Sequence, residues 1–218
     1  MNCLITAATA REIAPFIAHY RDTEKLVHID LQLDVLVTGI GLTAATYSLT
    51  KHFSLRRPDL VIQAGVAGCF DTRLPLGAVV AIKQDTIADE SVVELERLKT
   101  LFDLRLVPQN ATPYKKGWLV NPDAGLFRRS RLKGVKGISV NQISTDKKMI
   151  RFYRSHFDPV TESMEGAALH YVCLRENIPF LQIRSISNYI GERNKKKWNM
   201  QDSIRNLNHE LVRLLESL

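Results

Sequence analysis

The chain has 218 residues, of which 45% are hydrophobic and 24% charged, and its formal net charge is +7. This length suits one α/β domain with a sizeable core, so we expect residues 1–218 to form a single domain. The apolar runs are strand-sized, which excludes a membrane span, and the amino terminus lacks the pattern of a signal peptide. We therefore expect a cytoplasmic protein with no membrane partner.

The positive charge lies in separate groups, centred on residues 128–131, 147–154 and 193–197. Aromatic residues do not interleave with these groups as they do in segments that stack on nucleic-acid bases. We therefore expect a solvated basic surface and no nucleic-acid partner. The same charge also favours an acidic small substrate.

The cysteines Cys3, Cys69 and Cys173 are far apart in the sequence and odd in number. This pattern is typical of buried free thiols in a reducing compartment, and not of a disulfide framework or a zinc site. The six histidines have no metal-ligand spacing either. The sequence therefore predicts no metal, and no motif in it points to a cofactor.

Apolar runs of strand length alternate with helical patterns along the chain. In chain order we predict a strand at 2–8, a helix at 9–20, a strand at 33–37, a helix at 43–53, strands at 59–63, 78–82 and 138–143, a helix at 164–176, a strand at 180–186 and a helix at 200–217. Thr43 is a candidate N-cap, and residues 105–124 read as a loop with a short strand. This alternation predicts the α/β class, as three α/β/α layers around a central mixed, mostly parallel sheet.

In such a sheet the ligand site gathers at the carboxyl ends of the strands. The chain breaks there at residues 9–12, 39–41, 65–68, 141–145 and 187–191, so these five loops are the candidate site. The pairs Gly39/Gly41 and Gly65/Gly68 let the backbone approach a ligand closely. Neither pair forms a dinucleotide or Walker loop.

Three polar residues in or beside these loops can carry chemistry. Glu12 can activate a water as general base, or it can be an ordinary acid in the first turn of a helix. Glu165 can accept hydrogen bonds from a ribose diol while Met164 packs on the sugar, or it can simply begin a helix. Asn188 can pair with O6 and a protonated N7 of a 6-oxopurine, or it can close its strand in an Asx turn. Taken one at a time, these positions leave both interpretations open.

Together these residues resemble the purine nucleoside phosphorylase and nucleosidase superfamily. Within it, the chain is most similar to the futalosine hydrolases, which are relatives of the 5′-methylthioadenosine/S-adenosylhomocysteine nucleosidases. The matching pieces are Glu12, Thr-Gly-Ile-Gly at 38–41, Gly-Val-Ala-Gly at 65–68, Glu-Ser-Met-Glu-Gly-Ala-Ala at 162–168 and Ile-Arg-Ser-Ile-Ser-Asn-Tyr-Ile-Gly at 183–191. The resemblance covers essentially the whole chain and is weakest at about 90–135. The run that extends to Trp198 points to the futalosine branch.

The resemblance implies a role for each matching residue. Glu12 would activate the water and Asn188 would hold the departing base, so these two are the implied catalytic residues. The implied substrate-binding residues are Ile40, Ala67, Gly68, Ile143, Met164, Glu165, Ser187 and Trp198. Among them, Met164 and Glu165 would hold the ribose, and Trp198 would cover the 5′ substituent.

Two departures from the wider superfamily narrow the substrate and the nucleophile. The adenosine-type nucleosidases carry an Asp where this chain has Asn188, and an amide suits a 6-oxopurine, so hypoxanthine is the expected leaving group. The bacterial hexameric phosphorylases carry a phosphate-binding Arg where this chain has the uncharged Gln63. Water is therefore the expected nucleophile, although Arg11 remains a possible anion ligand and keeps phosphorolysis open.

The resemblance thus implies that futalosine is cleaved to hypoxanthine and dehypoxanthinyl futalosine in menaquinone biosynthesis, without a cofactor. It also implies a homodimer or higher homo-oligomer. The substrate's carboxylate would meet a basic rim, for which the candidates are Lys147, Lys148, Arg193 and Lys195–Lys197. Alternatives are a methylthioadenosine-type nucleosidase, a phosphorylase, a ligand-binding protein without activity and, more distantly, a nucleic-acid-binding module.

Overall fold

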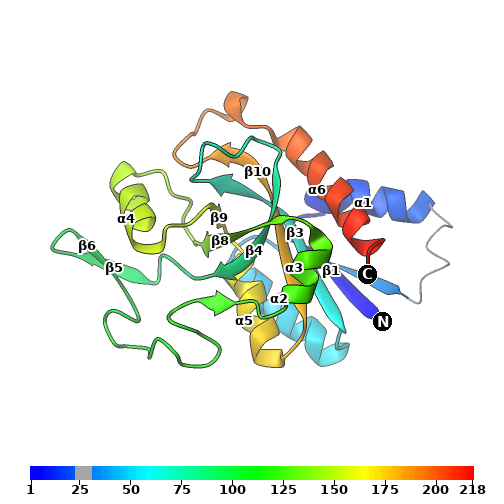
Figure 1. The fold of residues 1–218 in the computed structure, drawn as a ribbon, viewed down its shortest axis with the longest axis horizontal. Helices are drawn as coiled ribbons and strands as arrows, with labels where there is room; N and C mark the ends of the chain where they lie inside the picture. Colours follow the sequence, from blue (N-terminus) through cyan, green and yellow to red (C-terminus); the bar gives the residue numbers. More distant parts are fainter. Residues whose placement is uncertain (23–30) are drawn as a thin grey trace.

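The computed structural model describes residues 1–22 and 31–218, and a central sheet lies between helices in it (Figure 1). The strands of this sheet are β1 (Asn2–Ala7), β2 (Gln32–Val37), β3 (Leu60–Cys69), β4 (Val79–Asp85), β7 (Leu119–Val120), β8 (Lys133–Ser139), β9 (Thr161–Ser163) and β10 (Phe180–Tyr189). A separate hairpin consists of β5 (Ser91–Glu94) and β6 (Arg97–Thr100). The helices are α1 (Ala10–Asp22), α2 (Leu42–Leu55), α3 (Ala124–Ser130), α4 (Lys147–Phe157), α5 (Gly166–Glu176) and α6 (Met200–Leu215), with a 3₁₀ turn, η2 (Lys195–Lys197).

Helices cover both faces of the sheet because successive residues of its strands point to opposite sides. Ile5 of β1 packs in one core with Leu207 and Leu211 of α6, and α1 lies beside α6 on this face (Figure 1). The preceding residue, Leu4, packs in a second core with Leu49 of α2 and Leu169 of α5. The predicted three-layer α/β/α arrangement is confirmed.

The sheet is mixed but mostly parallel, as predicted. In the described residues, β1 lies between β2 and β3 and is parallel to both, and β3 is also parallel to β10. Strand β4 is antiparallel to β10 and β7 but parallel to β8, which is parallel to β9. Strand β9 then returns antiparallel to β3, so β3, β10, β4, β8 and β9 close a circuit. The carboxyl ends of β1, β3 and β10 meet at one end of the sheet.

The predicted break at residues 65–68 is wrong, because β3 continues through them to Cys69. The glycines there make room for side chains and do not form a turn. A Cβ at Gly65 would overlap the guanidinium of Arg184, and a Cβ at Gly68 would overlap Ile190. Strand β10 likewise runs past its predicted end, and its register with β3 shifts between Ile186 and Asn188. Such a bulge changes the direction in which a side chain points.

Other boundaries also differ from the predictions. Helix α2 begins one residue before Thr43, and its N-cap is Gly41, whose φ of 95° favours glycine. Helix α5 begins at Gly166, with Glu165 as its N-cap. The predicted strand at 138–143 is β8, which starts at Lys133 and ends at Ser139, because its first half alternates basic residues and glycines and lacks an apolar run. The β5–β6 hairpin, α3 and α4 were not predicted.

Cys3, Cys69 and Cys173 are free and buried, as the sequence indicated. Among residues 1–22 and 31–218, no helix has both the length and the apolar character needed to cross a bilayer.

Candidate functional site

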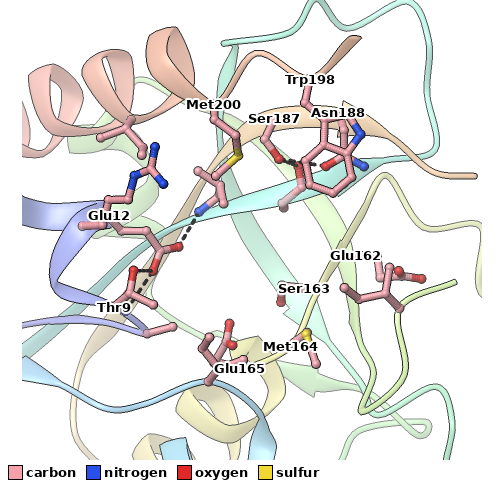
Figure 2. Close-up of a pocket in the computed structure, with 18 of the residues that line it drawn as sticks. Thr9, Glu12, Glu162, Ser163, Met164, Glu165, Ser187, Asn188, Trp198 and Met200 are labelled. Carbon is pink, nitrogen blue, oxygen red and sulfur yellow. Dashed lines mark hydrogen bonds between the residues drawn. The ribbon is translucent and has the colours of Figure 1, made fainter. Parts of the chain in front are cut away.

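A cavity of about 270 Å³ opens at the carboxyl ends of β1, β3 and β10. Figure 2 shows Glu12 on one side of it, Asn188 and Trp198 on the other, and Met164 and Glu165 between them. Every residue predicted to be catalytic, or to bind the base, ribose or 5′ substituent, lines this one cavity: Glu12, Ile40, Ala67, Gly68, Ile143, Met164, Glu165, Ser187, Asn188 and Trp198. Segments from residue 8 to residue 204 therefore converge on a single pocket.

Glu12 lies in the first turn of α1 and is almost completely buried. Its Oε2 accepts hydrogen bonds from the backbone N and the Oγ1 of Thr9, both at 3.0 Å, as a carboxylate does when it reaches back to cap its own helix (Figure 2). Its Oε1 accepts from Val66 N at 3.1 Å. The carboxylate of Glu12 therefore both caps its helix and lines the cavity, so the capping contact does not exclude a role as general base.

Glu165 is held by contacts from two directions. The backbone N of Gly41, at the start of α2, donates to its Oε1 at 3.1 Å. The Nη1 of Arg184, a residue of β10 with 1% of its surface exposed, lies 3.6 Å from its Oε2. Because each oxygen has two lone pairs, the carboxylate can still accept hydrogen bonds from a ligand.

The amide of Asn188 contacts a hydroxyl and a backbone carbonyl, and the carbonyl favours one orientation of it. Ser187 Oγ donates to its Oδ1 at 2.8 Å, and its Nδ2 donates to Tyr189 O at 3.3 Å. Rotating the amide by 180° would bring Oδ1 against the Tyr189 carbonyl oxygen, which disfavours the flipped form. One lone pair of Oδ1 and one hydrogen of Nδ2 remain for a ligand.

Glu162, the first acid of the Glu-Ser-Met-Glu run, also lines the cavity. It accepts hydrogen bonds from Ser144 N, at 3.0 Å, and from Ser144 Oγ. Burial raises its pKa above the ordinary value, although the Ser144 hydrogen bonds oppose this. Glu162 therefore fixes the 141–145 loop, which carries Ile143, against β9.

The remaining wall of the cavity is mainly apolar. Trp198 is held by a hydrogen bond from its Nε1 to Glu192 O at 3.0 Å. The lining residues that the sequence analysis did not single out are Ala8, Thr9, Val66, Ser163, Ile190, Met200 and Ile204. Met200 and Ile204 are four residues apart, so they share a face of α6. The sequence shows that spacing, but it does not show that the first turns of α6 reach the site.

Arg11 is the only arginine or lysine among the described residues that line the cavity. It is exposed and has no ion-pair partner within the described part of the chain. The expected basic rim is not there: Lys147, Lys148, Arg193 and Lys195–Lys197 are absent from the lining. Lys148 and Lys197 instead pair with Glu96 and Glu192, because both lie on exposed segments beside those acids.

The model of the phosphorylase superfamily matches residues 4–217. The chain belongs to this superfamily. It is 27% identical over 173 residues, 74% of its length and 70% of the relative's, to a 5′-methylthioadenosine/S-adenosylhomocysteine nucleosidase of Maridesulfovibrio salexigens. It is 25% identical over 186 residues, 83% and 77% of the two lengths, to a futalosine hydrolase of Streptomyces coelicolor. The expected enzyme class, a nucleosidase that hydrolyses N-glycosidic bonds, is confirmed. The names of the relatives refer to different substrates, methylthioadenosine and S-adenosylhomocysteine in one case and futalosine in the other.

Solved structures agree on the fold. The 5′-methylthioadenosine/S-adenosylhomocysteine nucleosidase of Helicobacter pylori, in complex with a substituted pyrrolidinol, superposes with a TM-score of 0.82 at 21% identity, and the match covers 100% of this chain and 99% of that chain. Native futalosine hydrolase of the same organism gives 0.81 at 20% identity, with 100% and 98% coverage. At these identities the superpositions establish the fold and do not separate the two substrates.

Proposed function

We propose that the protein hydrolyses the N-glycosidic bond of futalosine, releasing hypoxanthine and dehypoxanthinyl futalosine, a step of menaquinone biosynthesis. The observation that carries the substrate assignment is Asn188, an amide that donates to the Tyr189 carbonyl and lines the cavity where an adenine-specific site would use an acid. A 6-oxopurine offers an acceptor at O6 and, once protonated, a donor at N7. The free hydrogen of Nδ2 and the free lone pair of Oδ1 match these two groups.

The reaction is a dissociative displacement. The C1′–N9 bond breaks, positive charge develops on the ribose, and one water adds to C1′. Glu12 takes the proton from that water, and solvent supplies the proton that N7 of the departing base requires, because an amide is not an acid. The carboxylates of Glu12, Glu162 and Glu165 surround the cavity and favour the developing cation.

Glu165 and Met164 bind the ribose in this proposal. The two carboxylate oxygens of Glu165 accept hydrogen bonds from the 2′- and 3′-hydroxyls, and Met164 packs against the sugar. Figure 2 shows the Met164 and Glu165 side chains next to each other at the cavity. Ala67, Gly68 and Ser187 lie along β3 and β10 on the purine side, and Ile143 reaches the base from its loop. Ile40 and Trp198 supply the apolar walls for the 5′ substituent.

Arg11 binds the carboxylate at the far end of the 5′ substituent. Arg11 has no ion-pair partner among the described residues, and it is the only cation that they place on the lining, so it suits an anionic part of the ligand. This replaces the basic rim expected from the sequence. Gln63 supports water as the nucleophile, because it lies buried beneath the cavity, where its Oε1 accepts from Arg184 and it offers no charge to phosphate.

A methylthioadenosine-type nucleosidase is the second candidate. The apolar surfaces of Trp198, Met200 and Ile204 suit a methylthio group as well as an aromatic ring, and several curated relatives carry that name. Arg11 and Asn188 both favour futalosine over this candidate.

We further propose that residues 1–218 form one domain, that the enzyme is cytoplasmic, and that it works as a homodimer or a multiple of it. The open side of the cavity is consistent with a partner subunit, because the large apolar side chain of Ile40 is 62% exposed there. Size-exclusion chromatography with light scattering tests this, and a monomer at working concentration would contradict it.

Product analysis tests the function. The protein is incubated with futalosine, inosine and methylthioadenosine, with and without phosphate, and the released base is identified by chromatography. We expect hypoxanthine from futalosine at an equal rate without phosphate. Adenine as the main product would contradict the substrate, and a requirement for phosphate would contradict hydrolysis. A Glu12→Gln preparation, purified in parallel, controls for contaminating nucleosidases.

A further inference from the structure

A buried polar network lies behind Glu165, on the side away from the cavity. Arg184 and Gln182 are two residues apart on β10, so their side chains leave the same face of the strand. Gln182 is 1% exposed, and Asp85 of β4 and His170 of α5 are fully buried. None of these four residues lines the cavity. Burying four such polar side chains costs stability unless each is hydrogen-bonded.

The donors and acceptors of the network can all be assigned without conflict. With its amide oriented to match its neighbours, Gln182 accepts from Arg184 Nε at 3.0 Å and donates to Asp85 Oδ2 at 3.2 Å and His170 Nε2 at 2.9 Å. His170 Nδ1 lies 2.8 Å from Leu119 O, so Nδ1 carries the proton and Nε2 is free to accept. Each donor in the network thus faces an acceptor.

A second arm leaves Asp85 toward the start of α5. Asp85 Oδ1 accepts from Ser139 Oγ at 3.0 Å, and Ser139 Oγ in turn accepts from Ala167 N at 2.8 Å. Ala167 lies two residues after Glu165, in the first turn of the helix that Glu165 begins. The arm therefore fixes the backbone that carries Glu165.

Both arms start at Asp85 and end at Glu165. One reaches its carboxylate through Gln182 and the Arg184 guanidinium, and the other reaches its backbone through Ser139. The residue between the two arms is Gly166, where a Cβ would overlap both Asp85 Oδ2 and the Gln182 amide. The glycine of the Glu-Ser-Met-Glu-Gly run is therefore required by the network and not by a turn.

We propose that Asp85 and Gln182 are positioning residues for Glu165, which hold Arg184 and the first turn of α5 so that the Glu165 carboxylate keeps one orientation at the cavity wall. The network touches no substrate, so it acts only through Glu165. The ribose-binding role of Glu165 rests on the proposed function, whereas the orientation of its side chain does not.

Two variants and one control test this proposal. Gln182→Met keeps the length of the side chain and removes its hydrogen bonds, and Asp85→Asn removes the charge at the origin of both arms. Asn121→Leu is the control, because Asn121 is also buried and its Nδ2 also bonds to β10, at Phe180 O, but it has no link to Glu165. Thermal melts select variants that fold.

Kinetics give the first readout. We expect Gln182→Met to lower kcat/KM for futalosine by about 10- to 100-fold, with Asn121→Leu near wild type. In a Glu165→Gln background, adding Gln182→Met should have almost no further effect, because the residue it positions has lost its function. An equal fold-loss in both backgrounds would overturn the proposal.

Crystal structures of the two variants give a readout that needs no activity. We expect the Arg184 guanidinium to leave Glu165 and the Glu165 Oε1 to Gly41 N hydrogen bond to lengthen or break. Glu165 and Arg184 in unchanged positions in both variants would overturn the proposal. A wild-type enzyme that releases no base from any nucleoside would refute the proposed function, and the crystal structures would still decide the positioning claim.

Discussion

The two acids at the cavity, Glu12 and Glu165, are held by different means. The carboxylate of Glu12 is fixed by Thr9, at the start of its own helix, and by one backbone N–H of β3. Glu165 is fixed by a guanidinium that a buried side-chain network supports. In the proposed mechanism Glu12 accepts a proton from water, so it needs access to water. Glu165 binds two hydroxyls of the ribose, so its carboxylate needs a fixed orientation. The difference predicts that mutations in the buried network disturb Glu165 and leave Glu12 unaffected.

The largest expected effect comes from Glu12→Gln. The amide cannot take a proton from water, so we expect kcat for futalosine to fall by about 10²- to 10⁴-fold with little change in KM. Steady-state assays of hypoxanthine release measure this, and a thermal melt controls for the lost helix cap. Full activity in a folded variant would remove Glu12 from the chemistry.

Replacing Glu165 should give the next largest effect. Glu165→Gln removes charged hydrogen bonds to the ribose, so we expect kcat/KM to fall by about 10- to 100-fold. The loss should be smaller for a substrate that lacks the 2′-hydroxyl, since part of the interaction is already absent. Competition assays with the two substrates measure the ratio, and equal losses would contradict the diol contact.

The network behind Glu165 also predicts a dependence of stability on pH. Burial raises the pKa of Asp85 from 3.8 to about 6 and lowers the pKa of His170 from 6.5 to about 4. Asp85 therefore stabilises the fold near pH 4, and this contribution is lost as the pH rises through 6. His170 does the opposite, because its contribution is present above pH 6.5 and is lost as the pH falls toward 4.

In wild type the two contributions oppose each other between pH 4 and 6. In Asp85→Asn only that of His170 remains, so we expect the unfolding free energy to fall on acidification by about 1.4 kcal/mol more per pH unit than in wild type. Urea unfolding at several pH values measures this slope. Parallel curves for the two proteins would show that Asp85 does not titrate in this range.

The smallest expected effect is that of Arg11→Met. Arg11 is exposed, so its interaction with a carboxylate is worth about 1 kcal/mol, and we expect a loss of about fivefold in kcat/KM for futalosine. Inosine, which lacks the carboxylated substituent, should be unaffected and serves as the control. Lys148→Met is a matched surface control, and equal losses for both substrates would place Arg11 elsewhere in the mechanism.

The sequence was sufficient for the local features of the site. The fold class followed from the alternation of strand and helix patterns, and the predicted site residues followed from residues near strand ends, such as Glu12 and Asn188, together with the family resemblance. Their roles stay predictions. The glycines at 65 and 68 misled the strand prediction, because a glycine that makes room for a neighbour looks the same in sequence as one that forms a turn.

The support of Glu165 could not be predicted, because its members come from four separate elements. His170 and Gln182 look like isolated polar residues in apolar runs, Asp85 lies in a polar stretch, and only the folded protein brings the three together. Arg184 alone indicated that a partner was present, because a charged residue within a buried strand needs an oppositely charged or hydrogen-bonded neighbour. The start of β8 was also missed because it depends on distant parts of the chain. Lys133 and Lys136 interrupt the apolar pattern of a strand, and pairing with β4 and β9 stabilises the strand there.

The central claim, that Asn188 selects a 6-oxopurine, is tested most directly by two substrates that differ only in the base. The kcat/KM values for futalosine and for its 6-amino counterpart are measured with the wild type and with Asn188→Asp. We predict that the wild type prefers futalosine by tenfold or more, since an amino group at C6 faces the Nδ2 donor, and that Asn188→Asp shifts the preference toward the 6-amino substrate. A wild-type enzyme that cleaves the 6-amino substrate faster would contradict the account.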